Sequence, residues 1–129
     1  MSAAIRIIVL MCCFIALSNS FYCAITVRVT SKTEKKFKAV VIVPALRVQS
    51  LPMIFEGKGT KKVKINGEEC GSQKWIFRTY KWKHDKWKPA KNITTKLQGT
   101  GWIRAVVGDD LEPHLTDRFG IACYDGTCA

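Results

Sequence analysis

Short segments in which apolar and polar residues alternate run through most of this chain, and turn-forming residues separate them. In segment 24–30, for example, Ile25, Val27 and Val29 occupy every second position between polar residues. Successive side chains of a strand point to opposite faces, so this pattern predicts a β-strand with one buried face. Apolar stripes at helical spacing are nearly absent after residue 20. We therefore expect an all-β fold.

The expected strands are short and evenly spaced along the chain. Segment 37–43 is apolar on both faces, which predicts a central or covered strand. Segment 46–55 is interrupted by Pro52, so we expect it at an edge or in a loop. A turn at Asn66-Gly67 should end one strand. The remaining expected strands are residues 61–65, 74–82, 87–97, 100–107 and 119–124. About seven or eight strands predict a small antiparallel β-sandwich or barrel.

The N-terminus carries the three parts of a secretory signal. Arg6 is the only charged residue among the first 20, and an unbroken apolar run covers residues 7–17. This run suits a signal-peptide core and is too short to span a bilayer, which takes roughly 20 residues. Ser18 and Ser20 provide the small side chains that precede a cleavage site before Phe21. A cut two residues earlier is the alternative.

Cleavage leaves residues 21–129, which is the length of a single domain. No second apolar run of comparable length follows, so we expect a secreted, extracellular protein whose mature chain has no transmembrane segment. Asn92-Ile93-Thr94 is an N-glycosylation sequon. It predicts a solvent-facing Asn92 and, in a eukaryotic host, a glycoprotein.

Four cysteines remain after the signal, and an even number in an oxidising compartment predicts two disulfides. Residues 124–127 are expected to form a tight hairpin with Asp-Gly in its turn. This hairpin would place Cys123 opposite Cys128 at disulfide distance. Cys23 would then pair with Cys70. The alternative joins Cys70 to Cys123 across two sheets and Cys128 to Cys23.

The formal net charge is +11 at pH 7, from 21 lysine and arginine residues against 10 aspartate and glutamate residues. A surface of this charge attracts polyanions and anionic membranes. Outside the cell these partners are anionic glycans, lipid headgroups and acidic protein surfaces rather than genomic nucleic acid. If the lysine clusters at residues 32–38, 58–64 and 74–91 lie on one side, they form a binding patch. If they are scattered, the charge serves solubility.

Segment 75–91 interleaves aromatic rings with cations, which is the most unusual pattern in the chain. Aromatic rings stack on sugars or bases, and neighbouring cations bind sulfate, phosphate or carboxylate groups. A turn at residues 83–86 should place Trp82 opposite Trp87. The alternative, which is the more common outcome for a single strand, places one aromatic row in the core with the lysines as its solvated rim. The candidate ligand surface consists of Arg78, Lys81, Trp82, Lys83, Lys86, Trp87 and Lys88.

Acidic residues gather in segment 108–117. Asp110, Glu112 and His114 would share one face of an extended strand, but Pro113 interrupts that regularity. The spacing also fits no EF-hand calcium loop. We therefore expect a solvated turn with local ion pairs and no metal site. The candidate partners for the ion pairs are Arg104 and Arg118.

Motifs for catalysis are missing from the sequence. His84 and His114 are the only histidines, and the chain has no nucleophile elbow, zinc-protease motif or glycine-rich phosphate loop. We expect a non-catalytic secreted binding module that needs no cofactor and contacts an acidic partner through the basic aromatic surface. The alternative is a carrier of a lipid or small apolar ligand within the sandwich, which the apolar segments 37–43 and 46–55 suggest.

Overall fold

The structure is a computed structural model, and it describes residues 22–128. The predicted signal peptide, residues 1–20, lies outside the described residues, as does Phe21. The strands are β1 (Tyr22–Ser31), β2 (Phe37–Val43), β3 (Val48–Gln49), β4 (Met53–Phe55), β5 (Gly59–Glu68), β6 (Trp75–Lys83), β7 (Lys86–Val107) and β8 (Pro113–Tyr124). Two single-turn 3₁₀ helices are η1 (Pro44–Leu46) and η2 (Cys70–Ser72). In this part of the chain no helix has the length and apolar character needed to span a membrane.

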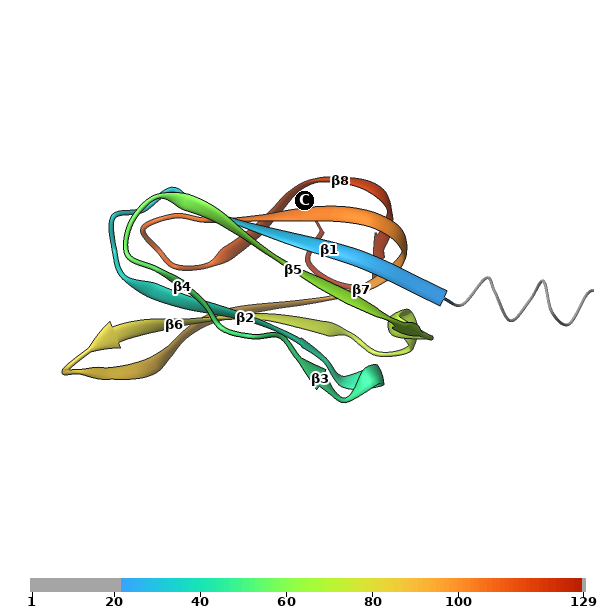
Figure 1. Cartoon of the computed structure of the whole chain (residues 1–129), viewed down its shortest axis with the longest axis horizontal. Helices are drawn as coiled ribbons and strands as arrows, with labels where there is room; N and C mark the ends of the chain where they lie inside the picture. The colour runs from blue at the N-terminus through green and yellow to red at the C-terminus, as the bar shows by residue number, and fades with distance from the viewer. Residues whose placement is uncertain (1–21, 129) are drawn as a thin grey trace, which may run out of the picture.

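The strands form one curled mixed sheet, a half-barrel, with the hydrogen-bonded order β3-β2-β6-β7-β1-β5. In addition, β4 pairs with β2 and β8 pairs with β7. β7 serves both halves of the sheet, because residues 86–95 pair with β6 and residues 96–107 pair with β8. Figure 1 shows the resulting two layers, with β1, β5 and β8 above and β2, β3 and β6 below.

The expected all-β, disulfide-linked fold of about eight strands is confirmed. The sheet is mixed rather than wholly antiparallel, because β1 runs parallel to β7, with Thr26 beside Trp102. Segment 46–55 contributes only the short strands β3 and β4, which pair with β2. This agrees with the edge position predicted from Pro52, and it leaves β2 between these strands and β6.

β7 joins two segments that the sequence pattern separates, residues 87–97 and 100–107. Gly99 and Gly101 lie at the junction with φ of 128° and 157°. β8 passes so close to this point that a Cβ on Gly101 would overlap the carbonyl oxygen of Phe119. The glycines therefore permit a close approach between two strands, and they do not end β7.

Two strand ends differ from the sequence prediction. The turn expected at Asn66-Gly67 is wrong, because β5 continues through these residues and pairs there with β1. Gly67 lies against the side chain of Leu46, where a Cβ would overlap it. β8 begins at Pro113 rather than at Phe119, and proline is tolerated at the first position of a strand.

The core fills the space between the two layers. Ile25, Val27 and Val29 are buried, as the alternation in β1 predicts. From the other layer Trp75 and Phe77 are buried, so the first half of segment 75–91 does place an aromatic row in the core. The space beside Val29 and Phe77 measures about 10 Å³, which is room for about one water molecule.

Both preferred disulfides are confirmed, Cys23–Cys70 and Cys123–Cys128. Cys23–Cys70 ties the start of β1 to η2 across 47 residues of sequence. Cys123–Cys128 closes a separation of only 5 residues at the end of β8.

The hairpin expected at residues 124–127 does not form. The backbone N–H of Thr127 donates instead to the carbonyl oxygen of Thr94 on β7, at 2.9 Å. Gly126 passes so close to Thr94 and Thr95 that a Cβ there would overlap their backbone atoms. The predicted pairing is therefore correct, whereas the local geometry behind that prediction is wrong.

Candidate functional site

The hairpin formed by β6 and β7 extends past the core at its tip, residues 81–88 (Figure 1). Every residue of this tip is exposed except Trp87, which is half-buried. His84 and Asp85 form the two-residue turn, with φ of 53° and 59°. A type I′ hairpin turn requires positive φ at both positions, and histidine and aspartate are among the residues that tolerate it.

Four lysines lie on one face of this tip. The strand register places Lys81 opposite Lys88 and Lys83 opposite Lys86. We call these four residues the lysine square, with Cβ positions spaced roughly 5 Å across the strands and 7 Å along them. None of the four forms an ion pair with another residue of the described chain. Like charges directly opposite each other destabilise a sheet, so a bound anion would relieve this arrangement.

The other face of the tip carries aromatic rings. Trp82 and Trp87 are opposite each other in the register, as predicted, and their rings meet edge to face with centroids 4.9 Å apart. The Nζ atom of Lys36 lies 4.3 Å from the ring centre of Trp82. The Nζ atom of Lys38 lies 4.5 Å from the ring centre of Tyr80. These five residues are the aromatic–lysine cluster.

The candidate ligand surface therefore divides between two faces of the hairpin. Trp82 and Trp87 lie on the face opposite the lysine square, and Arg78 lies on the tryptophan face, two positions from Tyr80. Sequence reasoning missed Lys36 and Lys38, which reach the rings only because β2 pairs with β6. A usable signal was present, since these lysines alternate with the buried Phe37.

Asn92 lies on β7, opposite Arg78 in the register, and its side chain is exposed. An N-glycosylation acceptor must be accessible to solvent, and this position meets that condition. A glycan at Asn92 would stand on the same face as the aromatic–lysine cluster, since Arg78 lies on that face.

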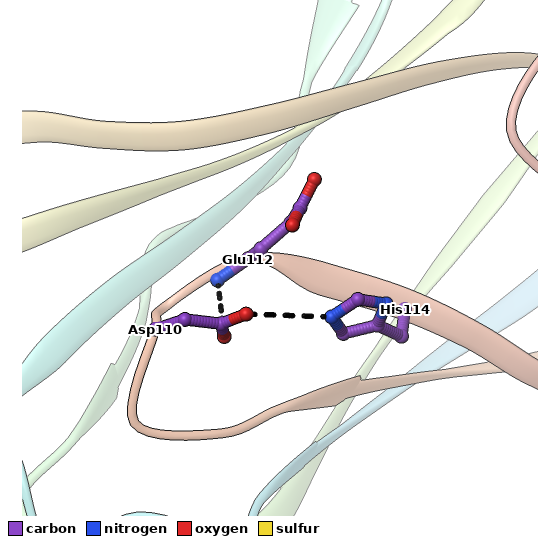
Figure 2. Close-up of side chains that lie close together, drawn as sticks. All are labelled: Asp110, Glu112 and His114. Carbon is purple, nitrogen blue, oxygen red and sulfur yellow. Dashed lines mark hydrogen bonds and ion pairs between the residues drawn. The ribbon is translucent and has the colours of Figure 1, made fainter.

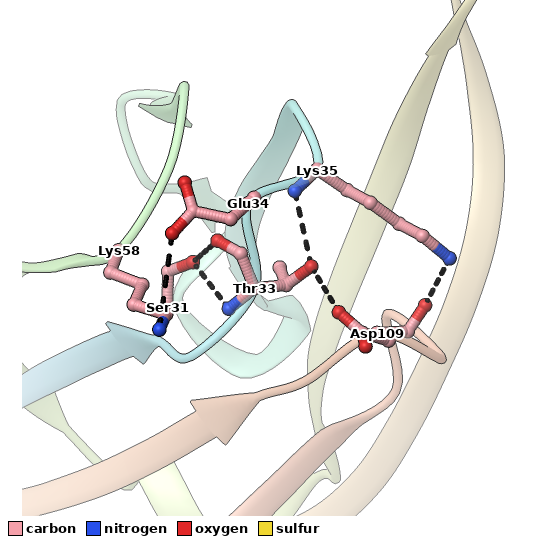
Figure 3. Close-up of polar contacts among 6 residues, drawn as sticks. All are labelled: Ser31, Thr33, Glu34, Lys35, Lys58 and Asp109. Atoms are coloured by element: carbon pink, nitrogen blue, oxygen red, sulfur yellow. Dashed lines mark hydrogen bonds and ion pairs between the residues drawn. The ribbon is translucent and has the colours of Figure 1, made fainter.

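Hydrogen bonds between two loops hold the segment that leads into β2 (Figure 3). The buried Thr33 donates from Oγ1 to the Asp109 carboxylate at 2.6 Å. The backbone N–H of Lys35 donates to Thr33 Oγ1 at 3.1 Å, and Lys35 Nζ donates to the carbonyl oxygen of Asp109 at 2.8 Å. These bonds join the loop before β2 to the loop before β8. They hold the segment from which Lys36 reaches Trp82.

Asp110, Glu112 and His114 come together in the turn that leads into β8 (Figure 2). Their potential metal-ligating atoms all lie within 4.8 Å of one another, a spacing at which these three residues could hold a cation. His114 Nε2 lies 3.6 Å from Asp110 Oδ2, and the Glu112 N–H donates to Asp110 Oδ1 at 3.0 Å. The side chains are exposed or half-exposed, as expected for a solvated turn.

The arginines expected to pair with the acidic segment behave differently from each other. Arg104 forms the expected ion pair, with its Nη1 atom 3.2 Å from Asp117 Oδ2. Arg118 instead donates from Nε to the carbonyl oxygen of Ile121 at 3.1 Å. The expected ion pair is thus found for one of the two arginines.

The Asp110 carboxylate is expected to titrate below free aspartate. The backbone N–H of Glu112 lowers the pKa of Asp110, and His114 lowers it further through a hydrogen bond and its charge. Because the pKa of Asp110 is lower in the folded than in the unfolded state, its carboxylate stabilises the fold at pH values above the pKa of the unfolded state. This stability is lost as pH falls through the pKa of the folded state. An NMR titration of the side-chain carbonyl carbon measures the midpoint, and His114→Ala should move it upward. A wild-type midpoint at or above that of free aspartate would contradict this prediction.

No protein-family model matches this chain, and no curated protein matches it significantly. The function proposed for the protein therefore rests on the geometry and charge of its own residues.

Proposed function

We propose that this protein is a secreted, non-catalytic binding module whose β6–β7 hairpin binds an anionic extracellular polymer, with sulfated glycans as the ligand class. The observation that carries the proposal is the lysine square. It gathers four ammonium groups that have no carboxylate partner among residues 22–128, on a hairpin tip that reaches beyond the core.

A sulfated glycan suits this geometry for two reasons. Its sulfate groups repeat from one sugar to the next, so one chain presents charges to both lysine pairs of the square. The reverse face offers Trp82, which is 40% exposed, as a ring on which a sugar can stack. Lipid headgroups and acidic proteins share the negative charge but present no repeating row of rings to stack on this face.

Secretion is supported by the signal features of residues 1–20 and by the two disulfides. Disulfides persist in oxidising compartments and are rare in the cytosol. Small extracellular domains commonly use them as staples, because a core of this size leaves little stability to spare.

The structure favours surface binding over carriage of a ligand inside the sandwich. Pockets for small molecules usually measure roughly 300–1,000 Å³. The space between the layers beside Val29 and Phe77 measures about 10 Å³. The doubly apolar β2, which suggests a carrier, is explained by its central position in the sheet.

Replacing the lysine square with glutamines tests the proposed function. The variant K81Q/K83Q/K86Q/K88Q should elute from a heparin column at much lower salt than the wild type. Each lost lysine–sulfate contact removes a counterion-release contribution, so the slope of log K against log salt should fall by up to about 3–4, by analogy with nucleic acids.

The matched control removes the same charge elsewhere. R47Q/K61Q/K74Q/K91Q changes four exposed cations outside the hairpin tip, none of which forms an ion pair within residues 22–128. It should shift elution only slightly. Equal shifts for the two variants would mean that net charge alone drives binding, and the proposal would fail. Binding to phosphatidylserine vesicles without binding to heparin would overturn the glycan as ligand.

A further inference from the structure

A second group of cations lies on the outer face of the layer that contains β1. Its centre is a row across three neighbouring strands, with Lys62 on β5, Arg28 on β1 and Arg104 on β7 in register. Adjacent strands are about 4.8 Å apart, so the row is roughly 10 Å long. The inward residues of this layer pack against the β2–β6 layer. The row and the aromatic–lysine cluster therefore face opposite sides of the molecule.

An aromatic ring holds two of these cations in place. The guanidinium carbon of Arg28 lies 4.5 Å from the ring centre of Trp102, and that of Arg104 lies 5.7 Å from it. Stacked guanidinium groups on strands lose little freedom when they bind an anion, because the ring already restricts them. The ring thus orients two of the three cations of the row, Arg28 and Arg104.

An open pocket of about 300 Å³ adjoins the row. The hydroxyls of Thr30 and Thr60, on neighbouring strands, are 3.0 Å apart. Lys32 brings an ammonium group that forms no ion pair within residues 22–128. The lining residues are Thr30, Lys32, Thr60, Arg104, Val106 and Thr116.

The pocket has the composition of an oxyanion site. Two cations supply the charge, and of the mutually bonded Thr30 and Thr60 hydroxyls one keeps its proton to donate to a sulfate or carboxylate oxygen. Asp117 contacts the rim, where its carboxylate binds Arg104 Nη1 at 3.2 Å and accepts from Thr116 Oγ1 at 2.8 Å. This carboxylate balances only part of the charge, since Lys32, Lys62 and Arg28 are close by and lack such a partner in the described chain.

We propose that this pocket and the adjoining row form a second site for a sulfated glycan, with one sulfate group held between Lys32 and Arg104. The identity of the ligand rests on the proposed function, whereas the site itself rests on the pocket. The pocket lies on the layer that contains β1 and the lysine square lies on the tip of the β6–β7 hairpin, so two separate sites on one small domain would let a single molecule bridge two glycan chains. The protein would then cross-link a polyanionic matrix, and a one-site module would only adhere to it.

Stoichiometry measured with a short heparin-derived oligosaccharide tests the second site. Native mass spectrometry of the wild type should show two oligosaccharides per protein. Lys64 lies two positions from Lys62 on β5, opposite Thr26, and so shares the face of the row. K32Q/K62Q/K64Q should retain one oligosaccharide, with affinity at the second site reduced more than about tenfold. The matched control R47Q/K61Q/K74Q, which removes three cations outside both sites, should retain two oligosaccharides.

NMR identifies which site is occupied in each protein. In K81Q/K83Q/K86Q/K88Q, the oligosaccharide should shift the amide signals of Thr30, Thr60 and Val106. One bound oligosaccharide in the wild type, with shifts confined to residues 81–88, would overturn the second site and leave the proposed function intact. Shifts confined to the pocket would support the second site and overturn the role of the hairpin.

Two further measurements complete the test. If inorganic sulfate produces the same amide shifts with the same affinity, the pocket is a site for free anions, and the proposal that it binds a glycan fails. Full-length heparin should raise the light scattering of the wild type by cross-linking it, and either site variant should abolish that rise. Undiminished scattering by K32Q/K62Q/K64Q would contradict the bridging role.

Discussion

Loss of the Cys23–Cys70 disulfide, in the variant Cys23→Ala/Cys70→Ala, is expected to lower the free energy of unfolding by about 4 kcal/mol. Loss of Cys123–Cys128, in Cys123→Ala/Cys128→Ala, is expected to lower it by about 2 kcal/mol. The difference follows from the sequence separations, 47 residues against 5. A longer closed loop restricts the unfolded chain more, so its release destabilises the fold more.

Urea denaturation of the two variants and the wild type measures this difference, and each variant serves as the control for the other. Since small domains are stable by roughly 5–15 kcal/mol, the first variant should lose a large part of the total. An equal loss in both variants would contradict the loop-length explanation. A larger loss of stability in Cys123→Ala/Cys128→Ala would also contradict it. That result would point to the contacts of Thr95, whose hydroxyl lies 3.1 Å from Cys123 Sγ and 3.2 Å from Cys128 Sγ.

Features that depend on one strand or on short sequence distances could be predicted from the sequence. The buried positions Ile25, Val27 and Val29 follow from the period of a single strand. The disulfide Cys123–Cys128 was predicted correctly although its hairpin was not. Two cysteines so close in sequence meet in several backbone conformations, so the pairing does not depend on one turn.

Features that depend on pairing between distant strands could not be predicted. Nothing local indicates that β1 lies parallel to β7, yet this pairing places Arg28 beside Arg104. In the same way, Lys38 reaches Tyr80 only through the pairing of β2 with β6. The cations of the second site and those of the aromatic–lysine cluster could therefore be grouped only once the strand register was known.

At the hairpin tip the predicted strand alternation is correct, but the residues predicted to form one ligand surface lie on two faces. Alternation alone places Lys81 and Trp82 on opposite faces of β6. In the part of β6 that faces the core, this alternation separates buried from half-buried side chains, as at Trp75 and Ile76. Beyond the core both faces are exposed, so the lysines and the tryptophans form two separate surfaces.

The lysine clusters are neither one patch nor an even scatter. Cluster 32–38 divides, because Lys32 lines the pocket beside β1 whereas Lys36 and Lys38 contact rings of the hairpin. Cluster 58–64 lies along β5, which is at the edge of the sheet. Lysines on an edge strand also discourage pairing with another chain, which is a structural benefit independent of any ligand.

Trp75→Ala is expected to lower the free energy of unfolding by about 3–5 kcal/mol. The side chain of Trp75 is fully buried, and its Nε1 donates to the carbonyl oxygen of Cys70 at 2.9 Å. The substitution would leave a cavity and remove the donor for a buried carbonyl oxygen. Trp75→Phe keeps most of the volume and loses the hydrogen bond, so its loss should be smaller, about 1–3 kcal/mol.

Trp82→Ala is the matched control on the same strand. Trp82 is 40% exposed and packs against Trp87 outside the core, so its loss should lower stability by only about 0.5–1.5 kcal/mol. The order should reverse for ligand binding. On the heparin column Trp82→Ala, although the more stable variant, should elute at lower salt than Trp75→Phe. A strongly destabilised Trp82→Ala would mean that the hairpin tip is part of the folding core. Its lysines and rings would then be explained by stability, and the case for a ligand surface on β6 would be lost.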